Sequence, residues 1–273
     1  MAKERILITV KTYPELSKKY GETVCTAGLR PDGSWVRMYP VPFRRLEDKE
    51  QYSKFDWVEC ILHRNKKDPR PESFCPRDMS QILPVGRMDT SDNWRDRRHF
   101  LLKPDAVTTD MQQLIRDAKA NRRSLATFKP TRLIGFEWEP TERDWDKGKM
   151  EAMRALVNQG DLFEDENWRK TFQVIPKLPY KFFYHFEDAE GKVRKLQIFD
   201  WEIGALFWNC HRRSNGDESE ALEKVHQKYW EEFIKKDLHF FLGTTLQHHF
   251  RARNPWVIIG VLPIPHEKQM SLF

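Results

Sequence analysis

Two carboxylates, Asp200 and Glu202, are the best candidates in the sequence for catalytic chemistry. They follow the strand-like segment 192–198, and Lys195 lies close to them in the chain. Paired carboxylates can hold a divalent metal that activates water, so a nuclease dependent on Mg²⁺ is one hypothesis, and Mg²⁺ would be its only cofactor. No Glu-x-Lys sequence follows Asp200, however, and Asp is a preferred N-cap for the helix expected after it. We therefore favour a structural role for Asp200 and expect neither a metal nor a cofactor.

Histidine and cysteine provide no second catalytic constellation. The four cysteines include no Cys-x-x-Cys pair and no Cys/His spacing typical of structural zinc sites, so reduced, mostly buried thiols are expected. No spacing ties His211, His248 or His249 to a nucleophile, which predicts surface positions for these rings.

A second set of candidates interleaves basic and aromatic residues. Residues 1–135 carry 27 Lys and Arg against 18 Asp and Glu, a net charge of +9, whereas residues 136–273 carry 20 against 23, a net charge of −3; together they give the +6 of the whole chain. Cations neutralise phosphates and release counterions, and exposed rings stack on unpaired bases, so DNA is the expected partner of the first half. The candidate DNA-binding residues are Trp35, Arg37, Arg44, Arg45, Arg64, Lys66, Lys67, Arg70, Trp94, Arg95, Arg97 and Arg98.

The most specific motif is the pentapeptide Gln269-Met270-Ser271-Leu272-Phe273. It resembles the linear motif by which bacterial replication and repair proteins bind the β sliding clamp, in which Gln leads and Leu-Phe closes. The resemblance implies that Leu272 and Phe273 are buried anchors, that Gln269 bonds to the pocket rim and that Met270 fills an adaptable sub-site. The alternative is that Leu272 and Phe273 pack on the protein's own core. A bacterial β sliding clamp is therefore the expected protein partner.

Another resemblance covers the opening of the chain. The segments Lys11-Thr12-Tyr13-Pro14, Glu22-Thr23-Val24-Cys25-Thr26-Ala27-Gly28 and Trp35-Val36-Arg37-Met38-Tyr39-Pro40 look like a family of uncharacterised prokaryotic proteins. This resemblance implies a shared fold and no particular activity.

The elements expected to carry the basic residues are mostly strands. Apolar, β-branched runs predict strands at 5–12 and 56–63, and a hairpin joins 23–29 to 34–39 through a Pro-Asp-Gly turn. These short connections suggest a small β-barrel or curled sheet. A basic, proline-broken surface loop follows at 64–77. A helix at 108–123 and a strand at 131–138 are expected after it.

The second half reads as a β-hairpin, two helices and two strands. The hairpin joins 180–186 to 192–198, Asp200 begins the first helix, the second covers 218–236, and strands 239–244 and 256–262 close the body. The fold class is therefore α+β. The expected divisions are a basic β-rich part at 1–139, a helical insertion or linker at 140–179, an α+β part at 180–262 and a flexible tail at 263–273.

Composition excludes several classes of protein. With 39% hydrophobic and 32% charged residues the chain is expected to fold, and it lacks the roughly 20 consecutive apolar residues of a membrane helix. A segment resembling a strand rather than a signal peptide follows Met1, so a cytoplasmic location without a membrane partner is expected. Our leading hypothesis is a DNA-associated accessory factor that the clamp recruits to replication, repair or anti-phage defence. A clamp-tethered nuclease and a protein-only regulator of the clamp are the alternatives.

Overall fold

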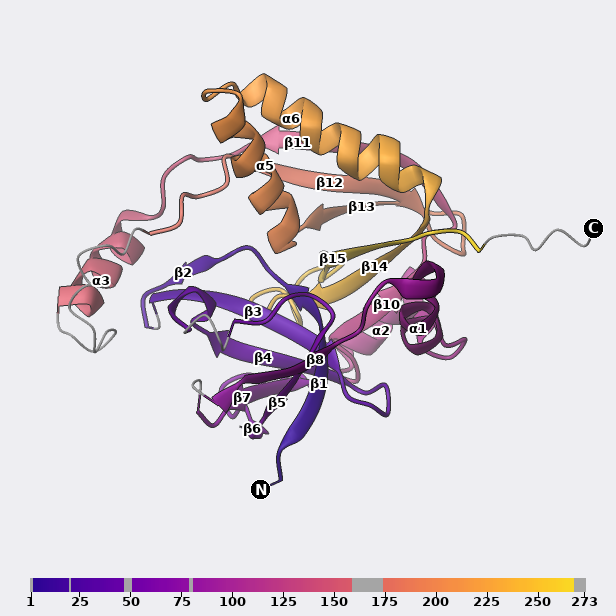
Figure 1. The fold of residues 1–273 in the computed structure, drawn as a ribbon, viewed down its shortest axis with the longest axis horizontal. Coiled ribbons are helices and arrows are strands. Elements are labelled where there is room, and N and C mark those ends of the chain that lie inside the picture. Colours follow the sequence, from indigo (N-terminus) through magenta and orange to yellow (C-terminus); the bar gives the residue numbers. More distant parts are fainter. Residues whose placement is uncertain (1, 20, 47–50, 79–80, 159–173, 268–273) are drawn as a thin grey trace, which may run out of the picture.

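Two β-sheets and the helices that cover them form the molecule (Figure 1). The computed structural model describes residues 2–19, 21–46, 51–78, 81–158 and 174–267. One sheet is curled like half a barrel, and the second sheet lies over it with α5 and α6 on its far face. The predicted α+β fold is confirmed.

The curled sheet contains the first eight strands in the order β6-β7-β4-β3-β1-β5-β8, with β2 paired to β3. A short 3-10 helix, Phe43–Arg45, follows β4. The strands are β1 Glu4–Lys11, β2 Glu15–Ser17, β3 Gly21–Leu29, β4 Trp35–Val41, β5 Asp56–Cys60, β6 Leu62–Arg64, β7 Ser73–Pro76 and β8 Leu83–Arg87.

The second sheet has the order β11-β12-β13-β15-β14-β10-β9. Its strands are β9 Val107–Thr108, β10 Leu125–Phe128, β11 Arg132–Pro140, β12 Tyr180–Glu187, β13 Val193–Ile198, β14 Asp237–Thr244 and β15 Trp256–Ile264. The helices are α1 Ser91–Leu101, α2 Met111–Lys119, α3 Lys147–Asn158, α5 Trp201–Arg213 and α6 Glu218–His226, and α6 continues through a π-turn, Gln227–Glu232, and a 3-10 turn, Phe233–Lys235.

Strand β1 shows how the sheets share their cores. Ile6 and Ile8 pack inside the curled sheet, whereas Leu7 faces the second sheet, as the two-residue period of a strand requires. A register shift between Ile8 and Val10 then brings Val10 into the same core as Leu7. The strand therefore has apolar residues on both faces, which explains its unbroken hydrophobic run.

Helix α5 begins as the sequence predicts. Asp200 is its N-cap, and the Asp200 side chain accepts a hydrogen bond from the backbone N–H of Glu202. Ile203, Gly204 and Phe207 form its buried face. A Cβ at Gly204 would lie 2.2 Å from the Tyr13 ring, so this position needs glycine for close packing between the helix and the N-terminal part.

The two sheets divide the chain between β8 and β9, in the region 88–106 that contains α1. The sequence predicts its first division at 139/140, at the end of β11. Strands β9, β10 and β11 pair within the second sheet, which no local pattern of their residues could reveal because their partners are distant in sequence. Among the described residues, no helix is both long and apolar enough to cross a membrane.

Candidate nucleic-acid interface

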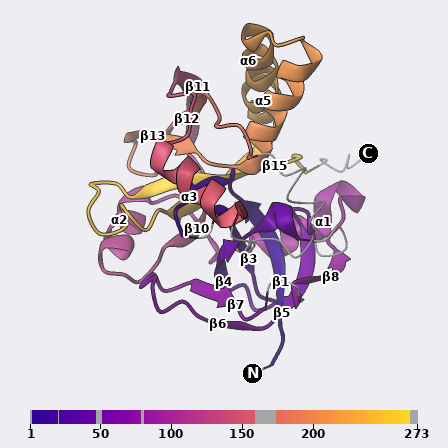
Figure 2. The ribbon, with the colours of Figure 1, turned by 90° about the vertical axis from the view of Figure 1, so that its left-hand side faces the viewer.

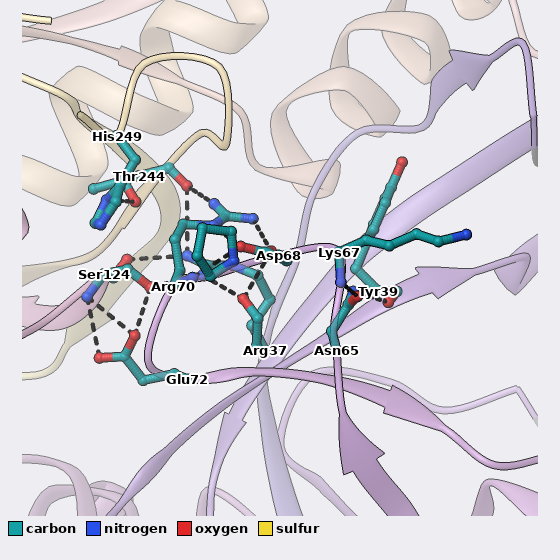
Figure 3. A network of polar contacts seen from close by, with 12 residues as sticks. Arg37, Tyr39, Asn65, Lys67, Asp68, Arg70, Glu72, Ser124, Thr244 and His249 are labelled. Carbon is teal, nitrogen blue, oxygen red and sulfur yellow. Dashed lines mark hydrogen bonds and ion pairs between the residues drawn. The ribbon is translucent and has the colours of Figure 1, made fainter. Parts of the chain in front are cut away.

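A buried polar network joins the curled sheet to the second sheet (Figure 3). Arg37, in β4, is only 1% exposed, although the sequence predicted it to contact DNA. Its Nη1 donates to Ser124 Oγ at 2.7 Å, and its Nη2 donates to the carbonyl oxygens of Ser124 at 3.0 Å and Thr244 at 3.4 Å. Burial is the main cause that lowers the pKa of Arg37, to about 10, so the side chain stays charged at neutral pH. Arg37 therefore links strands rather than facing solvent.

Arg70, in the loop between β6 and β7, is the second buried arginine of this network. Its Nε and Nη2 donate to the two oxygens of Asp68 at 2.8 and 2.5 Å, and its Nη1 donates to the carbonyl oxygen of Thr244. Burial alone would raise the pKa of Asp68, but the hydrogen bonds and charge of Arg70 lower it to about 2. The sequence predicted that Arg70 binds DNA, but in the structure Arg70 joins the loop between β6 and β7 to the end of β14.

A third connection ties the same loop to the turn between α2 and β10. The backbone N–H of Ser124 donates to both carboxylate oxygens of Glu72 at 3.1 Å, and the Ser124 hydroxyl donates to Oε2 at 2.5 Å. The Asn121 side chain also bonds to Pro69 and to His249, so residues 65–72, residues 120–124 and the loop 245–255 after β14 are held together at one side of the molecule. We call this side the three-loop face.

His249 is a buried hydrogen-bonding residue of the loop 245–255, although the sequence predicted this histidine at the surface. It is fully buried; its Nε2 lies 3.1 Å from Asn121 Oδ1, and its Nδ1 lies 2.8 Å from Thr244 Oγ1. The amide of Asn121 donates to the carbonyl oxygen of Pro69, so its Oδ1 must accept from His249 Nε2–H, and Nδ1 accepts from the hydroxyl of Thr244. Burial, followed by the charges of Arg70 and Arg37, lowers the pKa of His249 to about 4. The ring is therefore neutral near pH 7.

Exposed cations occupy all three loops. They are Lys66 and Lys67, Arg122 and Arg123, and Arg251 and Arg253. Figure 3 shows the Lys67 side chain pointing away from the buried network. The neighbouring side chain of Lys19 lowers the pKa of Lys67. Within the described part of the chain, Arg122 pairs with Asp117 at 2.9 Å, and none of the other five has a carboxylate partner. Each of the three loops therefore presents exposed positive charge.

Other predicted DNA-binding residues are used by the fold or lie elsewhere. Arg64 donates to the carbonyl oxygens of Arg70 at 2.8 Å and Ser73 at 3.2 Å. Its guanidinium therefore bonds to the backbone of its own loop. Arg44 pairs with the buried Glu22 at 2.7 Å, and Trp35 packs edge-on against Phe241. Arg45 ends the 3-10 helix Phe43–Arg45, and its side chain lies outside the described atoms.

The four predicted residues in α1 form a separate group. Figure 2 shows α1 on one side of the molecule and α2, next to the loop after β14, on the other. Arg97 is 4% exposed and lies over the rings of Phe55 and Trp94, whereas Arg98 faces Asp237 at 3.6 Å. Arg95 is exposed and pairs with Asp92. The twelve predicted residues therefore do not form one surface.

The acidic pair lies where α5 meets both sheets. Lys54 Nζ lies 3.4 Å from Asp200 Oδ2, 3.0 Å from Glu202 Oε2 and 3.1 Å from the carbonyl oxygen of Val261. Asp200 also accepts from the backbone N–H groups of Glu202 and Val261. Burial raises the pKa of Asp200 to about 6, whereas the two carboxylates raise that of Lys54. Protein donors thus occupy both oxygens of Asp200, and the N-cap interpretation of this residue is confirmed.

Beside this ion pair lies a cavity of about 400 Å³. Glu202, Trp94 and Arg97 all line it, so the structure brings one predicted catalytic residue next to two residues predicted to bind DNA. Lys54 lines the same cavity and separates it from Asp200.

A further group of possible metal ligands lies on α6 and the π-turn after it. Donor atoms of Glu223, His226 and Glu231 lie within 4.8 Å of one another. His226 packs on the rings of Phe136 and Trp138, which accounts for its position without a metal.

The predicted clamp-binding residues, Gln269, Met270, Ser271, Leu272 and Phe273, lie outside the described residues. The last described segment before them is β15, which ends at Ile264, followed by residues 265–267.

Two family models match the chain, and their boundary agrees with the division between the sheets. The model described as "Domain of unknown function (DUF8758)" matches residues 2–103, and the one described as "Domain of unknown function (DUF8757)" matches residues 107–273. No curated protein matches the chain. Each family region contributes one sheet, and the network of Arg37 and Arg70 joins the two regions.

Proposed function

The chain belongs to the family described as "Domain of unknown function (DUF8757)", and we propose that it is a DNA-associated accessory factor that the bacterial β sliding clamp recruits. The process it serves is replication, repair or anti-phage defence, and its place in the cell is the cytoplasm, at the nucleoid. The single observation that carries DNA association is the three-loop face. Five of its six exposed cations have no carboxylate partner among the described residues, and a buried network holds the loops that bear them.

The positive charge of the three-loop face favours a polyanion as its ligand. Like charges repel one another, and the lowered pKa of Lys67 beside Lys19 is an example of this repulsion. Phosphates would relieve the repulsion and release their condensed counterions. Because the loops are already tied together by Arg37, Arg70 and His249, binding would cost little ordering of the backbone.

Recruitment by the clamp is supported by the sequence of residues 269–273. The motif begins five residues after the end of β15, so the connection from the folded body is short. Such motifs bind with Leu and Phe anchors in a pocket, and here Leu272 and Phe273 supply them.

A nuclease remains the second hypothesis, but the geometry at Asp200 favours a structural role. Both oxygens of Asp200 accept hydrogen bonds from protein donors, and Lys54 stands where a cation would be needed. Metal binding would have to displace Lys54 from a buried site, which is costly unless the ammonium finds another partner.

One experiment separates the three hypotheses. Purified protein is tested for binding to the clamp, for binding to DNA as salt is varied, and for DNA cleavage with Mg²⁺. Binding to both clamp and DNA without cleavage supports the accessory factor. Cleavage that Asp200→Asn abolishes supports the nuclease, and clamp binding without DNA binding supports the regulator.

A further inference from the structure

Phe250 is an exposed aromatic ring in the loop 245–255 of the three-loop face. It is 49% exposed, and it is the one aromatic among the large hydrophobic side chains exposed in the described residues. Its neighbours in the chain are His249 on one side and Arg251 on the other. Exposure of such a ring is unfavourable in water, so a ligand that covers it would gain binding free energy.

The Phe250 ring packs against the buried ring of His249. His249 is fully buried and hydrogen-bonded on both ring nitrogens, and its ring meets that of Phe250 edge-on, with centroids 4.5 Å apart at 75°. The backbone around it is closed by hydrogen bonds from His249 N to Thr245 O at 2.9 Å and from Ala252 N to His248 O at 3.0 Å. Phe250 therefore lies in a turn whose backbone and neighbouring His249 side chain are both hydrogen-bonded.

We propose that Phe250 is a stacking platform for an unpaired base, so that the three-loop face binds single-stranded DNA in preference to duplex. This inference rests on the proposed DNA association and names its substrate. Cations that follow a phosphate backbone, combined with an exposed ring on which bases stack, are the two elements of single-strand binding. In a duplex the bases already stack on one another, so Phe250 would have no free base to cover.

A protein partner fits this ring less well. Protein interfaces are depleted of lysine, whereas another loop of the three-loop face carries the exposed Lys66 and Lys67. The only other large hydrophobic side chain exposed in the described part of this loop is Leu246, which makes the apolar area small.

The test measures affinity for a single-stranded oligonucleotide and for a duplex of the same length, at fixed salt. Phe250→Ala is expected to weaken single-strand binding about tenfold to a hundredfold while changing duplex binding little, and Phe250→Trp is expected to retain it. Val193→Ala is the matched control, because Val193 is also exposed but lies in β13. A single strand containing 2-aminopurine adds a direct readout, since stacking quenches its fluorescence with the wild type and not with Phe250→Ala.

The outcomes distinguish this inference from the DNA proposal on which it rests. If Phe250→Ala leaves single-strand affinity unchanged, or weakens duplex and single strand equally, the stacking platform is wrong. Loss of binding in Lys66→Ala with Lys67→Ala in the same assay would then still support DNA association. If the wild type binds neither strand form, both proposals fail.

Discussion

Arg70 donates a hydrogen bond to the carbonyl oxygen of Thr244, and this contact joins the regions matched by the two family models. The same guanidinium holds Asp68 through two further bonds. One arginine therefore fixes the basic loop between β6 and β7 against the end of β14. Its role is to organise the surface that carries Lys66 and Lys67.

We expect Arg70→Lys to destabilise the protein by about 3 kcal/mol. Lysine cannot reproduce the fork that binds Asp68 and Thr244 together, so the buried carboxylate loses both guanidinium bonds and keeps the Ser73 hydroxyl and the backbone N–H of residue 70. Urea unfolding measures the effect, and Lys66→Ala, an exposed change in the same loop, should stay within about 0.5 kcal/mol of the wild type. Equal stability of Arg70→Lys and Lys66→Ala would contradict the organising role.

The dependence of DNA affinity on salt concentration should show whether the cations of the three-loop face contact phosphates. Replacing Lys66, Lys67, Arg251 and Arg253 by Ala should reduce the slope of log affinity against log salt by about 0.7 for each single-strand phosphate that these side chains neutralise. Arg95→Ala is the control, because this exposed cation belongs to α1 on another side of the molecule. A decrease of slope in Arg95→Ala as large as in the loop variants would place the interface elsewhere.

The stability of the His249 site should depend on pH. Between pH 6.5 and about 4 the unfolded chain protonates this histidine and the folded chain does not, so its contribution to stability falls as pH falls through that window. The raised pKa of Asp200 acts in the opposite direction over a similar range, but it is common to the wild type and to His249→Gln. The stability difference between those two proteins should therefore shrink by about 2 kcal/mol from pH 7 to pH 4.5. A difference that is constant with pH would show that His249 is not held neutral.

Asp200 should prove necessary for stability beyond its role as an N-cap. A cap alone predicts a loss of about 1 kcal/mol in Asp200→Ala and almost none in Asp200→Asn. Because Lys54 is buried against Asp200, removing the carboxylate charge leaves that ammonium with Glu202 alone, and we expect Asp200→Asn to cost about 2 kcal/mol or more. The double variant Lys54→Met with Asp200→Asn should recover part of this loss. If Asp200→Asn is as stable as the wild type, Asp200 acts only as an N-cap.

Local patterns in the sequence predict the elements well but not the surface. The hairpin of β12 and β13, with its turn at Gly191, and the cap at Asp200 depend on neighbouring residues and are confirmed. Helix α1 has no such signal, because Asp92, Asn93 and Trp94 all adopt positive φ, a conformation that Asp and Asn adopt more often than other residues but that is rare for Trp.

The positions of the charged residues depend on distant partners. Arg37 and Arg70 look like surface cations in sequence, and their burial depends on partners far along the chain, Ser124 for Arg37 and Thr244 for both. Arg251 and Arg253 are absent from the predicted DNA-binding set because the net charge of residues 136–273 is negative, and an average over half the chain hides one basic loop. The interleaving of His, Phe and Arg at 248–253 is the signal that could have found them.

Calorimetric titration of the purified clamp with this protein measures whether residues 269–273 bind the clamp. We expect a dissociation constant in the micromolar range, about −8 kcal/mol, for the wild type and for the control Val193→Ala, an exposed residue outside the motif. Leu272→Ala with Phe273→Ala should remove most of this free energy while the melting temperature stays the same. Unchanged clamp affinity in that double variant, or no binding by the wild type, would contradict the account.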